Sequence, residues 1–171
     1  MFNFALNSLF NKERMRFFGN IEAKTDAKGR VFFPAVFRKE LLSAGEERLV
    51  MRKDIHQTCL VVYPESVWNE LLDALNTHLN RWNAGHRQLL RQFMTGVEMM
   101  TLDGSGRLLL PRRYLESAAI KQNILFKGLG DTIEIWSPEE EEKSMLSAEE
   151  FSASIEAVMA DAVSPQPHRE Q

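Results

Sequence analysis

The sequence has one cysteine, no long apolar run and no common catalytic motif, and these absences limit the functions it can have. Its single cysteine, Cys59, cannot form an intramolecular disulfide, so we expect a reducing, cytoplasmic setting. No stretch approaches the roughly 18 consecutive apolar residues of a membrane-spanning helix, so no membrane partner is expected. The four histidines lack metal-ligand spacing, and no serine-nucleophile elbow, phosphate loop or dinucleotide fingerprint occurs. These absences predict a protein that is not an enzyme and that holds neither a metal ion nor a cofactor.

Charge is unevenly distributed along the 171 residues. The composition, 44% hydrophobic and 26% charged, is typical of a globular protein with a real core. The net charge of −3 argues weakly against nucleic-acid binding, but the segment from Lys12 to Lys53 carries 11 basic and six acidic residues. Acidic residues gather instead in the last third, beginning with four glutamates at 139–142. The basic part of the chain is therefore the candidate surface for a polyanion.

One short motif occurs twice and organises the chain. Residues 26–30 read Asp-Ala-Lys-Gly-Arg and are followed by three apolar residues and Pro34. Seventy-seven positions later, residues 103–107 read Asp-Gly-Ser-Gly-Arg and are followed by three leucines and Pro111. Two copies are too few for a solenoid, which needs about three repeats or more. We therefore predict a duplicated unit whose two halves pack on each other.

The sequence around each motif predicts the same order of elements. Alternating apolar and polar residues predict a strand before the motif, and Asp and Gly supply turn chemistry before a returning strand. The proline that follows suits the first turn of a helix. The first copy is expected to have strands at 18–25 and 30–33, a helix at 35–42, and strands at 48–53 and 59–63. The second is expected to have strands at 96–102 and 107–110, a helix at 111–119, and strands at 123–127 and 132–136.

Further helices are expected between and after the two copies. An apolar stripe that includes Leu79 and Trp82 predicts a helix to residue 82, and a second helix over 86–94 buries Leu89, Leu90 and Phe93. The chain then divides into an N-terminal extension (1–15), a first repeat (16–66), a connecting helical hairpin (67–94), a second repeat (95–139) and an acidic C-terminal helix and tail (140–171). The apolar start of the extension also suggests a signal peptide, but its positive charges follow the apolar part instead of preceding it.

Each motif admits three interpretations. In the first, Asp caps the turn, Gly permits the bend and Arg pairs with Asp across the turn. In the second, Arg or Lys at a protruding turn contacts phosphates or the acceptor edge of guanine in nucleic acid. In the third, Asp26 or Asp103 binds a metal ion, although neither lies in a ligand series such as an EF-hand loop.

The two copies differ in their charged neighbours. The first motif is surrounded by Lys24, Lys28, Arg30, Arg38 and Lys39. The second motif keeps Arg107 but has Gly104 and Ser105 where the first has alanine and lysine. If one turn contacts nucleic acid, these differences point to the first.

In these motifs and in several other short segments, the chain resembles the bacterial MraZ proteins. The two motifs with their prolines carry the resemblance, together with Phe18-Gly19-Asn20, Leu60-Val61-Val62-Tyr63-Pro64, Trp68 and Glu134-Ile135-Trp136. The resemblance covers about residues 15–136. This sequence departs from the family pattern in two places. Family members usually begin near the position of Met15, and the second motif of this chain lacks a counterpart of Lys28.

The resemblance implies both a fold and a function. The fold is α+β, with two tandem AbrB-like swapped-hairpin repeats that form an intertwined, pseudo-dimeric β-barrel with flanking helices. The function is sequence-specific binding of double-stranded DNA at short promoter direct repeats. The resemblance further implies that the protein regulates the gene cluster for cell division and cell-wall synthesis. It implies a homo-oligomeric ring, located in the cytoplasm and on the nucleoid.

Roles for individual residues follow by position. Arg30 is expected to read a base edge while Lys28 and Lys24 hold phosphates, with Asp26 orienting the turn. In the second motif Arg107 is a further DNA contact and Asp103 is structural.

Two other functions compete with this one. The first is an antitoxin-type AbrB relative that binds its own promoter and neutralises a toxin, for which the tail after Ala162 is short. The second is a ring-forming scaffold whose partner is a protein that contacts the acidic C-terminal helix.

Overall fold

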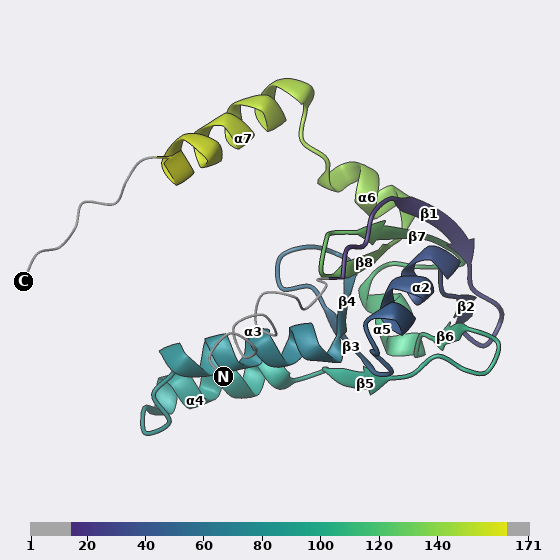
Figure 1. Ribbon diagram of the computed structural model, residues 1–171, viewed down its shortest axis with the longest axis horizontal. Helices are drawn as coiled ribbons and strands as arrows, with labels where there is room; N and C mark the ends of the chain where they lie inside the picture. Colours follow the sequence, from purple (N-terminus) through teal and green to yellow (C-terminus); the bar gives the residue numbers. More distant parts are fainter. Residues whose placement is uncertain (1–14, 164–171) are drawn as a thin grey trace, which may run out of the picture.

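Strands from the two repeats interleave in one antiparallel sheet (Figure 1). The computed structural model describes residues 15–163. The strands are β1 (Asn20–Lys24), β2 (Arg30–Phe32), β3 (Leu49–Lys53), β4 (Leu60–Pro64), β5 (Glu98–Met100), β6 (Arg107–Leu109), β7 (Asn123–Gly128) and β8 (Ile133–Trp136). The order β1-β7-β8-β4-β3-β5 places a first-repeat strand next to a second-repeat strand at three of its five junctions.

The two repeats are related by an approximate two-fold symmetry within this sheet. β1 pairs with β7 and β5 pairs with β3 in equivalent register, because Ile21 faces Phe126 while Glu98, 77 positions after Ile21, faces Met51. Met51 and Phe126 therefore occupy equivalent places. The described ladders do not include one between the outer strands β1 and β5.

The strands on either side of each motif take partners from the other repeat. β2 and β6 form a separate two-stranded ladder, while β1 pairs with β7 instead of with β2. The turn chemistry is thus where the sequence predicts it, but the strand returning from the turn does not pair with the strand that enters it. The mixed α+β class is confirmed.

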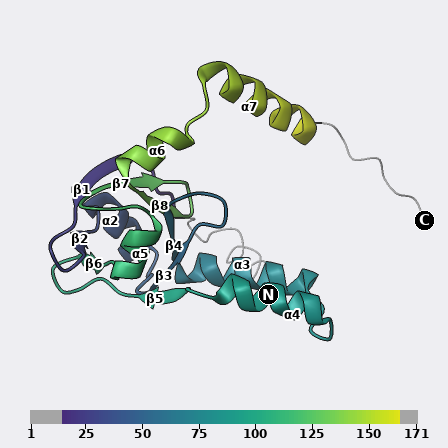
Figure 2. The same ribbon diagram turned by 180° about the vertical axis from the view of Figure 1, so that it is seen from behind.

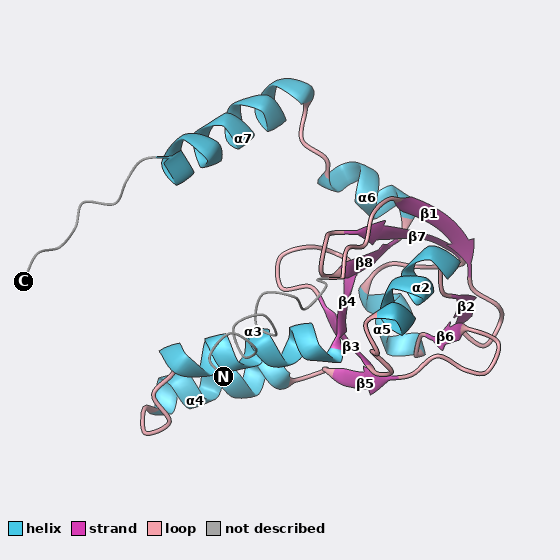
Figure 3. Ribbon diagram, viewed as in Figure 1, coloured by secondary structure: helices cyan, strands magenta, loops and turns pink. Residues whose placement is uncertain are grey.

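Within residues 15–163, six helices lie between and after the strands and cover the body or extend from it (Figures 1 and 3). They are α2 (Ala35–Ser43), α3 (Glu65–His78), α4 (Ala84–Met94), α5 (Arg112–Ser117), α6 (Pro138–Ser144) and α7 (Ala148–Val163). Pro34 and Pro111 are the N-cap residues of α2 and α5, one position earlier than the predicted first turn. There the missing N–H leaves no helical hydrogen bond unmade.

The core is shared between the repeats. Phe37 packs edge-to-face against Phe17 at 5.5 Å between ring centroids, and Phe33 packs in the same way against Phe126 at 5.8 Å. Phe126 comes from the second repeat and the other three from the first. Separating the repeats would expose this cluster, so the two halves form one hydrophobic core.

The helical hairpin differs from the prediction in two ways. α3 ends at His78 instead of continuing to residue 82, so Trp82 lies in the turn with 96% of its surface exposed. Leu89 on α4 was expected to be buried and is 60% exposed, while Leu90 and Phe93 are half-buried. In Figures 1 and 2, α3 and α4 extend away from the body, so among the described elements each helix has only the other as a neighbour along much of its length.

The C-terminal helices leave the opposite end of the body. Ser137 caps α6 by accepting a hydrogen bond from the backbone N–H of Glu140 at 3.2 Å, as its position before Pro138 predicts. α7 stands apart from the body in both views (Figures 1 and 2), and all its residues are exposed. The predicted extension, apart from Met15, and the end of the tail lie outside the described residues.

Candidate nucleic-acid interface

The first motif forms a turn that is clamped by its own aspartate. One carboxylate oxygen of Asp26 accepts hydrogen bonds from the backbone N–H groups of Lys28 at 2.9 Å and Arg30 at 3.0 Å. The other oxygen accepts from Nε of the Arg30 side chain at 2.7 Å. The backbone N–H of Gly29 closes the turn on the carbonyl of Asp26, and its φ of +84° is available to glycine with little strain.

The second motif repeats this geometry at every position. Asp103 accepts from the backbone N–H groups of Ser105 and Arg107 at 2.9 Å each, and from Nε of Arg107 at 2.8 Å. Gly106 takes a φ of +79° at the equivalent place. Turn chemistry, the first interpretation of the motif, is therefore present in both copies.

Hydrogen bonding keeps both carboxylates ionised. The backbone N–H of Arg30 is the main reason that the pKa of Asp26 lies below its usual 3.8, with the Arg30 side chain adding to it. The backbone N–H of Arg107 lowers the pKa of Asp103 in the same way. Each arginine is thus held at Nε by a charged acceptor. Both Nη groups of Arg30 and of Arg107 are without a protein partner in the part of the chain that the structure describes.

The two turns belong to one surface. In the β2–β6 ladder Arg30 pairs with Leu109 and Phe32 pairs with Arg107, so these four side chains share a face. Val31, between Arg30 and Phe32, points to the opposite face and is buried. Phe32 is 65% exposed and Leu109 is 51% exposed. Two arginines and two exposed apolar side chains therefore share the outer face of this ladder, each arginine opposite one apolar residue.

Each turn is locked to the other repeat. The carbonyl of Gly29 accepts a hydrogen bond from the N–H of Leu110 at 2.8 Å, and that of Gly106 accepts from Phe33 at 3.0 Å. A Cβ at Gly29 would lie 2.5 Å from the carbonyl oxygen of Leu110. Glycine is required here by a close backbone approach as well as by its positive φ.

The basic side chains divide between the turns differently from the prediction. Lys24 and Lys28 are exposed near the first turn, and neither forms an ion pair with another described residue. Arg38 was expected beside the first turn, but its guanidinium packs against Gly106 of the second. Arg38 also lines a shallow pocket with Asp103 and its turn. The second turn, which has serine in place of Lys28, therefore has a cation from α2 next to it.

Sequence reasoning missed Phe32 and Leu109 as members of this surface. Both were assigned only to the apolar triplets before each proline. The strand period of two could have found them, because Val31 and Leu108 point inward and their neighbours must then point outward. The position of Arg38 beside the second turn could not be predicted from nearby residues. It depends on which repeat supplies the partner strand.

Other kinds of site find less support among the described residues. None of the described helices combines the length and apolar character that a membrane-spanning helix requires. Within residues 15–163, no three histidine, cysteine or carboxylate side chains are grouped so that they could hold a metal ion.

The fold and the paired turns define a class of protein: two fused α+β repeats that present both copies of one clamped arginine turn on a single ladder. A family model described as "MraZ protein, putative antitoxin-like" matches residues 17–92 and again residues 93–162. The chain belongs to the MraZ family.

Relatives from several bacteria carry the same name. The chain is 57% identical over 145 residues to the "Transcriptional regulator MraZ" of Phocaeicola vulgatus, a match that covers 85% of this chain and 94% of that one. It is 52% identical over 147 residues to the protein of that name from Bacteroides fragilis, covering 86% and 93%. The protein of that name from Flavobacterium psychrophilum is 31% identical over 144 residues, covering 84% and 91%.

Proposed function

We propose that this chain is a sequence-specific DNA-binding transcriptional regulator that reads short direct repeats through its two turns. The name of its relatives supports a role in transcription and not an enzymatic one. The observation that carries the proposal is the repeated clamp, in which Asp26 and Asp103 each hold Nε of an arginine and leave both Nη groups without a protein partner. The family resemblance further suggests the division and cell-wall gene cluster as target and the nucleoid as location.

The clamp suits base reading by Arg30 and Arg107. Two parallel N–H donors can bond O6 and N7 of guanine in the major groove, and a good pair of this kind contributes about 1–3 kcal/mol of discrimination. Fixing Nε beforehand limits the rotamer freedom that would be lost on binding. In this scheme Asp26 and Asp103 orient the arginines, and Lys24 and Lys28 hold phosphates.

The exposed apolar pair beside the arginines adds a second kind of contact. Phe32 and Leu109 lie on the same β2–β6 face, each opposite an arginine, and apolar side chains contact the methyl group of thymine in the major groove. A two-stranded ribbon is narrow enough to enter that groove. Arg38 takes the part that Lys28 plays in the first turn, as a cation beside Asp103.

Self-association into a ring would multiply these contacts. One protomer offers few base contacts, whereas several protomers at fixed spacing bind tandem sites at high effective concentration. Exposed apolar side chains on the helical hairpin and α7 support such assembly, because large apolar patches on a surface mark interaction sites. The patches contain Trp82, Leu89, Phe151, Ile155, Val158 and Met159.

We also propose that the interleaved sheet is the swapped-hairpin barrel of the AbrB type. Its support is that β1–β7, β3–β5, β4–β8 and β2–β6 each join one repeat to the other. The division into repeats at 16–66 and 95–139, with the hairpin 67–94 between them, belongs to the same proposal.

Fluorescence anisotropy with labelled DNA from upstream of the gene tests this function. Arg30→Ala should lose tenfold or more in affinity for the repeats and much less for scrambled DNA, because a base contact is removed. The control is Arg112→Ala, an arginine with a 90% exposed side chain outside the turns. Affinity should fall steeply with salt as counterions are released from the phosphates. Equal losses on specific and scrambled DNA would remove Arg30 from base reading.

A protein-binding scaffold is the second candidate, and α7 is the observation that favours it. Its sixteen residues are helical and all exposed, and they present an apolar side to solvent. A folded wild type that shows no salt-dependent binding to the repeats would favour this function over DNA reading.

A further inference from the structure

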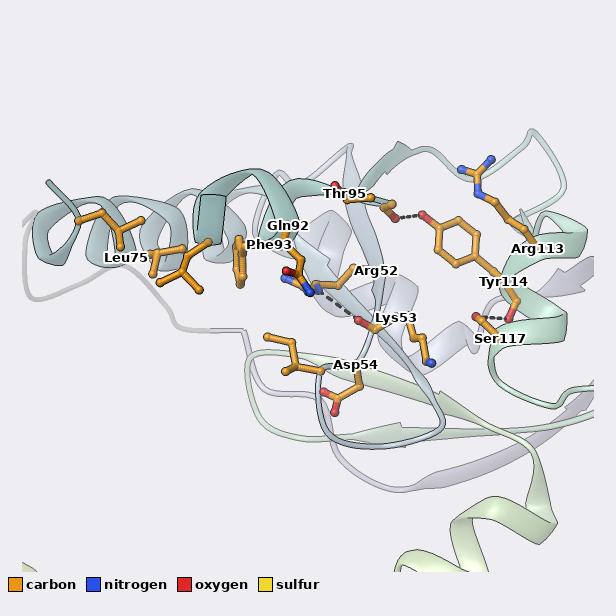
Figure 4. A pocket seen from close by; sticks show the side chains of 14 residues that line it. Arg52, Lys53, Asp54, Leu75, Gln92, Phe93, Thr95, Arg113, Tyr114 and Ser117 are labelled. Atoms are coloured by element: carbon orange, nitrogen blue, oxygen red, sulfur yellow. Dashed lines mark hydrogen bonds between the residues drawn. The ribbon is translucent and has the colours of Figure 1, made fainter. Parts of the chain in front are cut away.

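A pocket of about 660 Å³ lies between the helical hairpin and the body, away from both turns (Figure 4). β3 and the residues after it form one wall, and α3, α4 and α5 supply the others. Much of the lining is apolar, with Leu75, Leu79, Leu89 and Phe93 from the hairpin. Pockets of this volume with apolar walls and a few polar groups are typical of small-molecule sites.

The polar group that distinguishes this pocket is the guanidinium of Arg52. Only 8% of Arg52 is exposed. Its Nε donates to the backbone carbonyl of Lys53 at 3.1 Å, and its guanidinium carbon lies 4.2 Å from the centre of the Phe93 ring. The ring face attracts the cation but offers no acceptor in the plane of its N–H groups. Among the described residues, Nη1 is buried without a hydrogen-bond partner.

No carboxylate in the pocket lining is paired with Arg52. Asp54, the one acid in the lining, uses Oδ2 to accept from the backbone N–H groups of His56 at 2.7 Å and Gln57 at 2.8 Å. The lining contains two further cations, Lys53 and Arg113. Arg113 is already paired with Glu98. The lining therefore carries an excess of positive charge between apolar walls. A buried cation that is not paired with a carboxylate is unfavourable.

The second repeat shows what is missing in the first. Arg52 and Lys127 directly follow the equivalent residues Met51 and Phe126, so they occupy corresponding places on β3 and β7. Lys127 is paired through Nζ with a carboxylate oxygen of Glu141 on α6, at 2.5 Å, and both side chains are largely buried. The cation of the second repeat thus has an internal counter-ion.

The helix that follows the last strand of each repeat explains why Lys127 has a counter-ion and Arg52 does not. α3 and α6 leave the equivalent strands β4 and β8, and their N-cap residues are Pro64 and Ser137. The fourth residue after the cap is Trp68 in α3 and Glu141 in α6. The first repeat therefore has an indole where the second has the carboxylate, and Arg52 keeps its charge without the partner.

We propose that this pocket binds a small amphipathic carboxylate, whose headgroup pairs with Arg52 and whose apolar body lies along α3 and α4. The carboxylate supplies from the pocket the negative charge that Glu141 supplies to Lys127 in the other repeat, because Trp68 already fills the position equivalent to Glu141. Phe93 stacks on Trp68 with ring centroids 5.6 Å apart and planes 10° apart, so an occupant beside Phe93 also adjoins a fluorescent residue. No residue of the motifs at 26–30 and 103–107 lines the pocket, so this site is separate from the two turns.

Isothermal titration of the full-length, assembled protein tests the proposal. The probes are decanoate, decanol and decyltrimethylammonium, which share one chain and differ in charge, each used below its micelle concentration. Decanoate should bind at least tenfold more tightly than decanol and change the tryptophan emission, while the cation should show no saturable binding.

Three variants locate the binding. Arg52→Gln removes the charge and should weaken decanoate binding at least tenfold. Gln92→Glu adds a negative charge to the lining on an exposed part of α4, and it should weaken decanoate binding without changing that of decanol. Arg112→Gln, outside the lining, should bind all three probes as the wild type does.

Each contrary result is also decisive. Equal binding of decanoate and decanol would make the pocket merely apolar and overturn the assignment. Wild-type affinity in a folded Arg52→Gln protein would do the same, and if that variant does not fold, an unchanged response of Gln92→Glu would overturn it. A wild type that binds no probe, together with an Arg52→Gln protein of smaller assembled mass, would assign the pocket to a neighbouring copy instead.

Discussion

Replacement of Gly29 by alanine measures how tightly the first turn is locked to the second repeat. The new residue would keep a φ of +84°, which costs a residue with a Cβ roughly 1–2 kcal/mol. Its Cβ would also lie 2.5 Å from the carbonyl oxygen of Leu110, a backbone atom that cannot turn away. Forced shifts of this kind typically cost about 1–3 kcal/mol. The expected total loss in the free energy of unfolding is therefore about 2–5 kcal/mol.

Gly45 provides the matched control. It has a φ of +70°, but a Cβ there would meet no atom within 4 Å. Gly45→Ala should lose only the roughly 1–2 kcal/mol of the backbone term. Urea unfolding followed by circular dichroism gives both values, and each kcal/mol lowers Tm by about 2–4 °C in a chain of this size. If the two variants lose the same stability, the close approach of Gly29 to Leu110 does not constrain the turn.

Three further results follow from the structure. Hydrogen bonds lower the folded-state pKa of Asp26 and Asp103, so the two ionised carboxylates stabilise the folded protein fully above the unfolded pKa of 3.8. This stabilisation is lost as the pH falls through the folded-state pKa values. Carboxyl chemical shifts that titrate at or above pH 3.8 would contradict this prediction. Burial raises the pKa of the Cys59 thiol far above its usual range, so a thiol reagent at pH 8 should label the unfolded but not the native protein, as mass spectrometry would show. Phe37→Ala should cost about 3–5 kcal/mol by removing a core ring, whereas Leu42→Ala on the exposed side of α2 should cost less than about 0.5, both measured by urea unfolding.

The features that the sequence predicted well are local ones. Asp and Gly at fixed places in each motif predict a turn, because a carboxylate can cap nearby N–H groups and only glycine takes a positive φ easily. The apolar triplet and the proline predict a short strand and then a helix. The 77-residue offset doubles each of these signals, which is why β2, β6, α2 and α5 lie where they were expected.

The features that the sequence did not predict depend on partners far along the chain. A turn signal says that a strand returns but not which strand it meets, so the residues alone gave no sign that Arg38 would reach the second turn. Leu89 and Trp82 follow a helical stripe, but a stripe is buried only where another element covers it. The unpaired charge of Arg52 was equally hidden, because it results from the identity of residue 68 on a different element.

The interleaving of the strands also determines when the protein can fold during its synthesis. Asn20 on β1 pairs with Lys127 on β7, so β1 lacks its described partner strand until about a hundred further residues have been made. β2 must likewise wait for β6. A ribosome adding about 5–20 residues per second therefore leaves β1 unpaired for roughly 5–20 seconds and β2 for roughly 4–15 seconds. During that time β1 and β2 are exposed to other nascent chains, and the second repeat is the partner that closes them.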